Sequence, residues 1–309
     1  MDDILGNPLV SVVIATFNMG PYIVGAVESV LRQTYGNIEV HVVDDGSTDS
    51  TAEEMRQFAS DPRVTYQRQA NAGQASAKNR GIAASRGEFV AFCDADDLWL
   101  PNKLELQLPA FARPEVGLAY TRAVDLRGTP SIEPGFYDTE LAENAPRPQG
   151  HVTEALFVNN FVPFGTAMVR RECFDKVGVF DERYRMGIDW ELWLRISLHY
   201  EFAFVDAVTY LYRVWEGQMS NNWRGRYEYC FRIMRDFMAR YPDSVSEREV
   251  AHAWAVAYAS RARIRSYRAN EHVAALGDVI RCLRFKPAYF PAWRLFGRVA
   301  LNALGSRAP

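Results

Sequence analysis

Two widespread nucleotide-binding motifs are missing from this chain. It contains neither G-x-G-x-x-G, the glycine pattern of dinucleotide-binding folds, nor G-x-x-x-x-G-K-[ST], the loop that holds phosphates in many ATPases. No apolar run approaches the ~18 residues that a membrane-spanning helix needs. These absences argue against a dehydrogenase, a P-loop ATPase and an integral membrane protein.

Cysteine is scarce as well. The four cysteines among 309 residues lie far apart with no paired spacing, which favours free thiols in a reducing compartment. The chain starts with Met1-Asp2-Asp3 and soon enters an apolar strand pattern, without the basic and apolar segments of a secretory signal. We therefore expect a cytoplasmic protein.

The net charge of -3 hides an uneven distribution. Residues 1–223 contain 19 Lys and Arg against 31 Asp and Glu, whereas residues 224–309 contain 16 against 7. Such asymmetry indicates two surfaces with different partners. We predict one domain over 1–223 and a basic, separate region over 224–309.

Apolar periodicity predicts that strands and helices alternate in the first part of the chain. Strands are expected at 9–15, 38–43, 64–67 and 89–93, and helices at 21–31, from about 50 onward and at 74–85. This alternation implies a parallel sheet with helices on both faces.

The second part of the chain has a different pattern. Residues 114–150 are rich in Pro, Gly and acidic residues, which predicts a segment without regular secondary structure on the surface. Helices are expected at about 224–240, 247–268, 271–283 and 288–304.

Three of the predicted strands end in polar loops. These loops are TFN at 16–18, DDGSTD at 44–49 and DADD at 94–97. In an open α/β sheet the ligand crevice lies at the carboxyl ends of the strands, so the loops should converge on one rim. Mg²⁺ or Mn²⁺ would balance the repulsion between the DADD carboxylates and also bind phosphate oxygens. Alternatively, DADD and DDGSTD only form turns and cap the helices that follow.

Six segments follow one another between about residues 8 and 215. They read PLVSVVIATFN, SVLRQTY, VVDDGSTDST, NAGQASAKNRG, GEFVAFCDADDLWLPNKL and GIDWELWLRI. In this order and spacing they resemble the family 2 glycosyltransferases of GT-A fold. The resemblance implies an α/β fold with a Rossmann-like mixed sheet flanked by helices. The predicted helices after residue 223 then form a C-terminal extension that the resemblance does not describe.

The resemblance implies roles for the matching residues. The nucleotide-sugar site would comprise Thr16, Phe17, Asn18, Asp44, Asp45, Lys78, Arg80, Asp94, Ala95, Asp96 and Arg213. Asp45 would read the base, Lys78 and Arg80 would lie near the donor phosphates, and Asp96 with Asp94 would bind Mn²⁺ or Mg²⁺. Arg213 would supply positive charge where Trp215 replaces the family's frequent His.

Asp189 matches the catalytic base of the inverting members. Such a carboxylate takes the proton of an acceptor hydroxyl as that hydroxyl attacks the anomeric carbon. Without the resemblance, Asp189 would be interpreted as the N-cap of the helix that follows. Ile188 replaces an acidic residue found in many members, and Glu191 is the fallback base.

Three tryptophans invite a sugar-stacking interpretation. Trp190 and Trp193 are three residues apart on one predicted helix and fit a core position equally well, whereas Trp99, beside DADD, is the better candidate to face a sugar. The Q-x-x-R-W motif of processive polysaccharide synthases is missing. This absence favours the transfer of one or a few sugars.

The sequence thus predicts a metal-dependent inverting glycosyltransferase that uses a nucleotide-diphosphate sugar, UDP-linked by expectation, and a glycan or lipid-linked glycan acceptor. The alternatives are a catalytically silent scaffold of the same fold and a nucleotidyltransferase that makes sugar nucleotides. No nucleic-acid partner is expected. The basic C-terminal helices would contact either the inner face of the cell membrane, as a peripheral protein, or a second copy in a homodimer.

Overall fold

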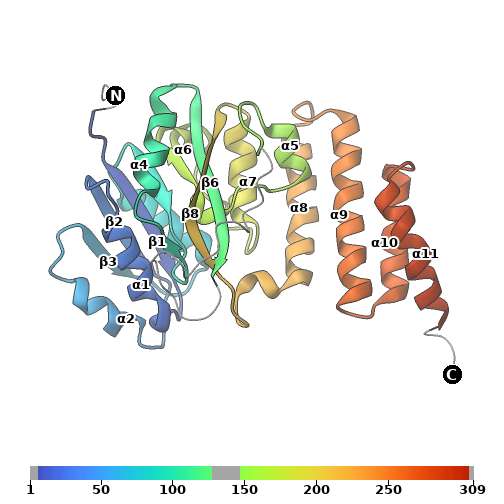
Figure 1. Cartoon of the computed structure of the whole chain (residues 1–309), viewed down its shortest axis with the longest axis horizontal. Coiled ribbons are helices and arrows are strands. Elements are labelled where there is room, and N and C mark those ends of the chain that lie inside the picture. Colours follow the sequence, from blue (N-terminus) through green and yellow to red (C-terminus); the bar gives the residue numbers. More distant parts are fainter. Residues whose placement is uncertain (1–5, 127–146, 306–309) are drawn as a thin grey trace. The chain divides into compact units, whose positions relative to one another are not determined.

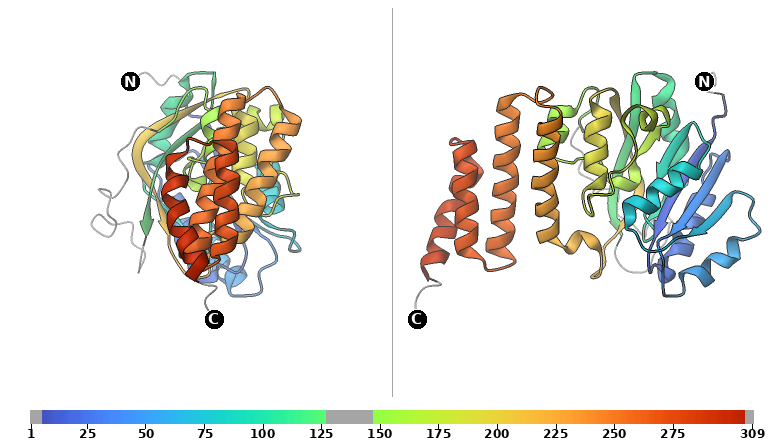
Figure 2. Two further views of the ribbon diagram at one scale, coloured as in Figure 1. Left: turned by 90° about the vertical axis from the view of Figure 1, so that its right-hand side faces the viewer. Right: turned by 180° about the vertical axis from the view of Figure 1, so that it is seen from behind.

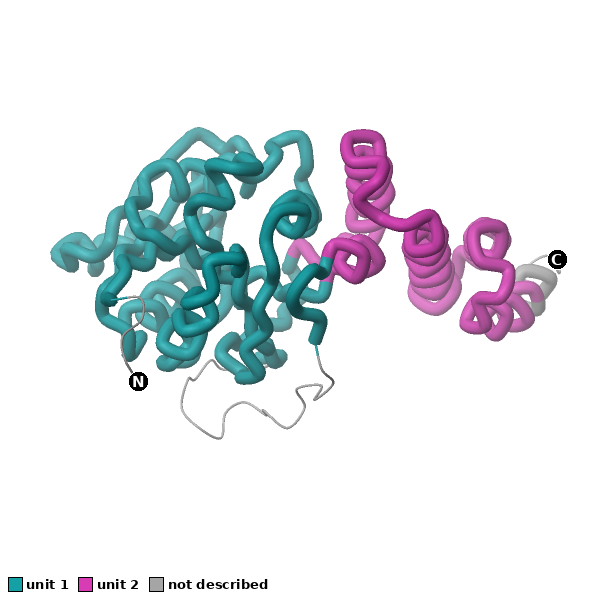
Figure 3. Tube along the Cα trace, turned by 90° about the horizontal axis from the view of Figure 1, so that it is seen from above, with its two compact units in different colours: residues 1–152, 161–218 teal, residues 153–160, 219–309 magenta. Residues whose placement is uncertain are grey.

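The computed structural model describes residues 6–126 and 147–305, and the chain divides into two compact units. The first unit comprises residues 1–152 and 161–218, and the second comprises 153–160 and 219–309 (Figure 3). The loops that follow the predicted strands belong to the first unit, whereas the whole basic region, 224–309, belongs to the second, which begins five residues earlier than predicted and also includes 153–160.

One sheet of eight strands organises the first unit (Figure 1). Its strands are β1 (Val10–Thr16), β2 (Ile38–Asp44), β3 (Val64–Arg68), β4 (Phe89–Phe92), β5 (Leu98–Trp99), β6 (Val116–Leu126), β7 (Met168–Arg170) and β8 (Glu201–Arg213). The spatial order is β3-β2-β1-β4-β7-β6-β8-β5. β1 to β4 pair in parallel, as do β6 and β8, whereas β7 and β5 pair antiparallel to their neighbours. The sheet is therefore mixed, as the resemblance implied.

Helices flank this sheet and complete its core. They are α1 (Gly20–Leu31), α2 (Thr51–Glu54), α3 (Gln74–Ala84), α4 (Lys103–Gln107), α6 (Glu172–Val177) and α7 (Ile188–Ser197). Pro21 lies in the first turn of α1, where its missing N–H costs nothing. α3 lies close to β1, because a Cβ at Gly81 would stand only 2.4 Å from a methyl carbon of Val13. The predicted positions of β1 to β4 and of α1, α2 and α3 agree with the structure to within a few residues.

Two expectations about β6 and β5 are wrong. An 11-residue strand, β6, occupies 116–126, in the segment expected to be irregular, and pairs with β8 and β7. The rest of that expectation falls largely on 127–146, which lie outside the described residues. Trp99 does not face a sugar site, because it is fully buried in β5 with Lys103 Nζ 4.1 Å from its ring centroid.

The second unit is helical (Figure 2). It contains α5 (Thr153–Val158), α8 (Trp223–Arg240), α9 (Glu247–Tyr267), α10 (His272–Phe285) and α11 (Phe290–Gly305). The last four lie close to the four predicted helices and run alternately up and down. Small and apolar side chains such as Ala255, Ala275 and Val279 pack between α9, α10 and α11. Within the described part of the chain, no helix has the length and hydropathy required to cross a membrane.

Candidate active site

The carboxyl ends of β1, β2 and β4 meet because these strands are parallel neighbours. Thr16 at the end of β1 lies opposite Asp44 at the end of β2. The loop at 94–97 begins two residues after β4 ends. The three polar loops named from the sequence therefore leave the same edge of the sheet.

The loops after β1 and β2 are tied to each other. Asn18 has a left-handed backbone, with φ of 54°, and its N–H donates to Ser47 Oγ at 2.8 Å. Its side-chain oxygen accepts from the backbone N–H of Thr48 at 2.8 Å. At the start of α1, the N–H of Gly20 donates to Asp49 Oδ2 at 2.9 Å. Phe17 is 44% exposed beside this braced backbone, so its ring is accessible to a flat ligand.

Asp44 and Asp45 are both buried, and protein groups donate to each of them. Asp44 accepts from Ser47 N–H at 2.7 Å and from the Tyr66 hydroxyl at 2.6 Å. Burial, together with this bond, raises the pKa of Tyr66. Asp44 therefore holds the turn after β2 against β3.

Asp45 braces the chain that leads into α3. Its carboxylate accepts from Gln69 Nε2 and from the backbone N–H groups of Ala72 and Gly73, each at 2.8 Å. Gly73 has φ of 97°, a conformation that favours glycine. The predicted contact of Asp45 with a base remains a prediction, and any such contact would have to share these oxygens.

The two basic residues of α3 that the sequence assigned to the donor phosphates have different surroundings. Lys78 is buried, with Nζ 3.4 Å from Asp94 Oδ1 and 3.8 Å from the centroid of the Phe164 ring. Arg80 is exposed, and its Nε donates to Gln67 on β3. The structure therefore brings Lys78, and not Arg80, to the DADD loop.

The carboxylates of the DADD loop differ sharply in environment. Asp97 is buried and accepts from the Tyr210 hydroxyl at 2.5 Å and from Arg213 N–H at 2.7 Å, so it anchors the loop to β8. Burial and the nearby charges of Asp96 and Asp94 raise the pKa of Asp97 well above its usual range. Asp94 lies beside Lys78, and Ala95 is buried between the two DxD carboxylates.

Asp96 is held by the last residue of β8 and by the segment that follows it. Its Oδ2 accepts from Trp215 Nε1 at 2.8 Å, and its backbone oxygen accepts from Arg213 Nε at 2.6 Å. The Arg213 guanidinium also lies 4.8 Å from the centroid of the Tyr22 ring. The sequence prediction included Arg213, noted Trp215 only as the replacement of the family's frequent His, and missed Tyr210. The contacts of Trp215 and Tyr210 with the DADD loop span more than 110 residues of sequence, so no local pattern shows that these side chains hold the loop.

The pair of Asp94 and Asp96 fits a divalent cation better than any other feature of this rim. Burial, followed by the charge of Asp94, raises the pKa of Asp96, so negative charge is incompletely balanced there. Mg²⁺ and Mn²⁺ need only one or two protein carboxylates when phosphate oxygens and water complete their shells. Across residues 6–126 and 147–305, no three His, Cys, Asp or Glu gather into a ready-made metal site.

Asp189 lies in the first turn of α7, and the N-cap is Gly187 in a left-handed conformation. The interpretation of Asp189 as the cap is therefore wrong, although the helix dipole still favours negative charge at this position. Glu191 forms a two-pronged ion pair with the buried Arg195, with O–N distances of 2.7 and 2.8 Å. That pairing makes Glu191 a poor fallback base.

The chain that leads into α7 is attached to α3. Asn79 exchanges hydrogen bonds with the backbone of Phe180, and Gln74 Nε2 donates to the Arg185 carbonyl at 3.0 Å. Trp193 packs in an aromatic cluster with Phe92 and Phe180 and is fully buried. α3 thus carries Lys78 toward the DADD loop and holds the segment that precedes Asp189.

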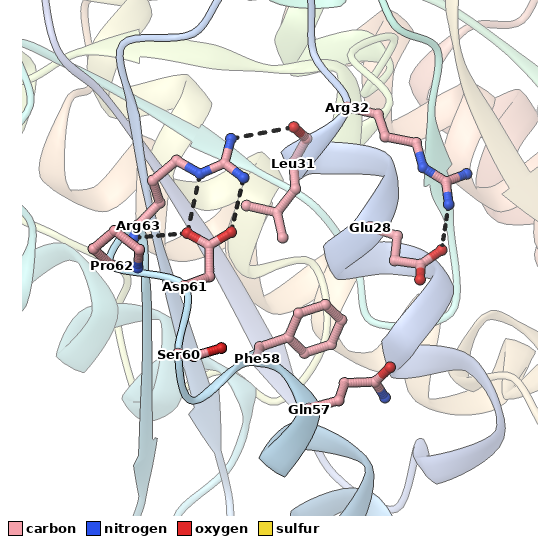
Figure 4. A pocket seen from close by; sticks show the side chains of 9 residues that line it. All are labelled: Glu28, Leu31, Arg32, Gln57, Phe58, Ser60, Asp61, Pro62 and Arg63. Carbon is pink, nitrogen blue, oxygen red and sulfur yellow. Dashed lines mark hydrogen bonds and ion pairs between the residues drawn. The ribbon is translucent and has the colours of Figure 1, made fainter.

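A hollow of about 670 Å³ lies elsewhere, between α1 and residues 57–63 (Figure 4). Its charged groups already pair with each other, Arg32 with Glu28 at 2.8 Å and Arg63 with Asp61 at 2.8 Å. None of the predicted site residues lines it. We therefore assign it no chemical role.

Comparison with known proteins gives the fold a family context. The chain is 34% identical over 198 residues to a glycosyltransferase of Rickettsia bellii, a match that covers 63% of this chain and 27% of that protein. This chain therefore aligns with only about a quarter of that relative's length.

Two solved structures share the fold. TarS 1–349 of S. aureus in complex with UDP-GlcNAc has a TM-score of 0.63 and 18% identity, over 96% of this chain and 92% of that one. The mannosyltransferase PcManGT from Pyrobaculum calidifontis, in complex with GDP-Man and Mn²⁺, has a TM-score of 0.57 and 19% identity, over 99% and 90%. These likenesses confirm the GT-A fold.

The matching family model is described as glycosyl transferase family 2 and covers residues 11–178, more than half of the chain. That range contains the three rim loops and α3. This chain belongs to glycosyl transferase family 2.

Proposed function

We propose that this protein transfers a sugar, with inversion at the anomeric carbon, from a nucleotide-diphosphate sugar to a hydroxyl of a glycan or lipid-linked glycan. The observation that carries the proposal is the pair of Asp94 and Asp96 at the carboxyl end of β4, with Lys78 Nζ 3.4 Å from Asp94. Two carboxylates and one buried ammonium group suit a metal-bridged diphosphate. UDP is the proposed nucleotide, as in the TarS complex.

Each loop of the rim has a part in donor binding. The braced backbone at 16–18, with the exposed Phe17 ring, would hold the base and ribose, and Asp45 would contact the base. Lys78 would neutralise a phosphate oxygen. Arg213 and Trp215 would keep Asp96 oriented through its backbone oxygen and Oδ2.

Asp94 and Asp96 are the residues that would hold Mn²⁺ or Mg²⁺. When bound, such an ion stabilises the negative charge that develops on a departing nucleoside diphosphate. The PcManGT structure, which contains Mn²⁺, supports this assignment by fold alone. The raised pKa of Asp96 means that a cation there would also favour the ionised carboxylate.

Asp189 is the proposed general base. Its place in the first turn of α7 favours a negative charge. The carboxylate would accept the proton of the acceptor hydroxyl while that oxygen forms its bond to the anomeric carbon and the bond to the diphosphate oxygen breaks. Glu191, paired with Arg195, would keep the following turn of α7 rigid.

The test separates donor binding from transfer. Mn²⁺-dependent binding and hydrolysis of a panel of nucleotide sugars would be measured by calorimetry and by release of the nucleoside diphosphate. We expect Asp96→Ala to lose both metal and donor binding, and Asp189→Asn to keep donor binding and lose turnover.

Asp175→Ala provides a matched control, because Asp175 is an exposed carboxylate on α6. It should behave as the unaltered protein. Wild-type turnover by Asp189→Asn would refute the base assignment. If no nucleotide sugar binds at any Mn²⁺ concentration, the protein is a silent scaffold instead.

A further inference from the structure

Helix α11 has one side that faces away from the packed helices of its unit. Phe290, Trp293, Arg294 and Arg298 are exposed there, with Phe290 at 67% and Trp293 at 52%. These four residues, called the α11 face below, recur at the spacing of one helix side. Ala292 and Val299 are buried on the other side.

The segment that carries the α11 face has charges of one sign. From Val279 to Pro309 the sequence contains six Arg or Lys and no Asp or Glu. The preceding carboxylate, Asp278, is fully buried and pairs with three arginines, namely Arg261 at 2.6 Å, Arg265 at 2.8 Å and Arg281 at 3.1 Å. It is therefore not available to neutralise the cations of α11.

We infer that the α11 face docks on the surface of an anionic lipid bilayer. Aromatic side chains are favoured at the level of lipid headgroups, where one part of the ring system is apolar and another is wet. Arginines beside them gain from the negative surface potential of such a membrane. The combination of exposed Phe and Trp with cations, and without an acidic residue, is the composition of an interfacial helix.

A second copy of the chain is a poorer occupant for this face. A two-fold interface brings the same patch of both subunits together, so Arg294 and Arg298 would meet their own counterparts. The segment after Asp278 offers no carboxylate to offset that repulsion. A soluble polyanion would pair with the arginines but would leave Phe290 and Trp293 in water.

The test is co-sedimentation of the full chain with vesicles, without donor or metal. We expect binding at low salt to vesicles of phosphatidylcholine mixed with phosphatidylglycerol, and none to phosphatidylcholine alone. The double variant Arg294→Glu/Arg298→Glu should lower the partition coefficient at least tenfold, since each cation removed near such a surface costs about fivefold. Phe290→Ser/Trp293→Ser should also lower it several-fold.

Arg56→Glu is the control, because Arg56 is exposed and belongs to the first unit, outside the helices that carry the α11 face. It makes the same kind of charge change and should leave binding nearly unchanged. Circular dichroism would establish that each variant is folded. Since no nucleotide sugar is involved, this result is independent of the proposed transfer reaction.

Three results would overturn the inference. The first is no binding of the unaltered chain to phosphatidylglycerol vesicles at low salt. The second is full binding by Phe290→Ser/Trp293→Ser, which would show that charge alone gives the binding and that the aromatic side chains do not enter the lipid surface. The third is a dimer mass by light scattering that Arg294→Glu/Arg298→Glu reduces to a monomer, without vesicle binding, which would assign the face to a second copy.

Discussion

Asp97 should be the carboxylate on which the shape of the DADD loop depends. It is buried, and it accepts from the Tyr210 hydroxyl and from the Arg213 N–H, both on β8. Asp97→Ala leaves these two buried donors without an acceptor, at about 1 to 3 kcal/mol each. The free energy of unfolding should therefore fall by roughly 2 to 6 kcal/mol, a large part of the ~5 to 15 kcal/mol that holds a typical protein folded.

Asp97→Asn should cost far less. The amide oxygen can still accept from Arg213 N–H, and the amide nitrogen can donate to the Tyr210 oxygen, because a hydroxyl group can act in either role. Burial and the charges of Asp96 and Asp94 already raise the pKa of Asp97, so removing its charge relieves repulsion. We expect a loss within about 1 kcal/mol, the value of an ordinary hydrogen bond.

Urea unfolding followed by circular dichroism would measure both variants, and Mn²⁺ titration would report on the loop. Because the chain has two compact units, the transition of the first unit has to be followed separately, for example by limited proteolysis. Equal and small losses for Ala and Asn would refute the anchoring role. Equal and large losses would show that the ionised carboxylate itself is required.

Three further predictions concern other contacts. Burial alone would raise the pKa of Glu39, but hydrogen bonds from Arg86 and Ser11 hold it at about 2, below its usual 4.5. The stabilisation that the ionised Glu39 gives the folded state is present above pH 4.5 and is lost as the pH falls toward 2. The difference in unfolding free energy between the unaltered protein and Glu39→Gln should therefore shrink from roughly 3 kcal/mol at pH 7 to near zero when the protein is titrated with acid. Trp215→Phe removes the N–H that supports ionised Asp96, so Mn²⁺ affinity measured by calorimetry should fall about tenfold; an unchanged affinity would contradict this role. Gly165→Ala puts a Cβ 2.0 Å from the Tyr210 ring, and unfolding experiments should show a loss of about 1 to 3 kcal/mol unless the ring moves freely.

The sequence was sufficient to locate the rim because strand ends carry a local signal. β1, β2 and β4 are short apolar runs that stop at polar residues, and parallel neighbours must bring their ends together. The four C-terminal helices were equally well predicted, since helical periodicity is also local. β6 was missed because its segment is adjacent to a stretch rich in Pro and Gly, and because its partners β7 and β8 lie 40 or more residues further along the chain.

The resemblance assigned Asp94 and Asp96 to a metal, but the residues of the DADD loop do not by themselves show how their roles differ. Asp94, Asp96 and Asp97 are chemically identical, and their differences come from Lys78, Trp215 and Tyr210, contributed by distant segments. Trp99 was misassigned for the same reason. Its proximity to the loop in sequence says nothing about β5 pairing with β8, which buries the ring.

Because Asp94, Asp96 and Asp97 have different partners, we expect them to have different roles in the loop. Asp97 faces inward and is held by two donors of β8, so it is suited to anchor the loop and not to bind a ligand. Asp94 already lies beside the Lys78 ammonium. Asp96 is only half-buried and receives a neutral indole N–H at its carboxylate, and burial together with Asp94 raises its pKa, so its charge is incompletely balanced while no donor of β8 holds its carboxylate. A cation that approaches this loop should therefore gain most at Asp96, with Asp94 as the second ligand and Asp97 as the fixed support.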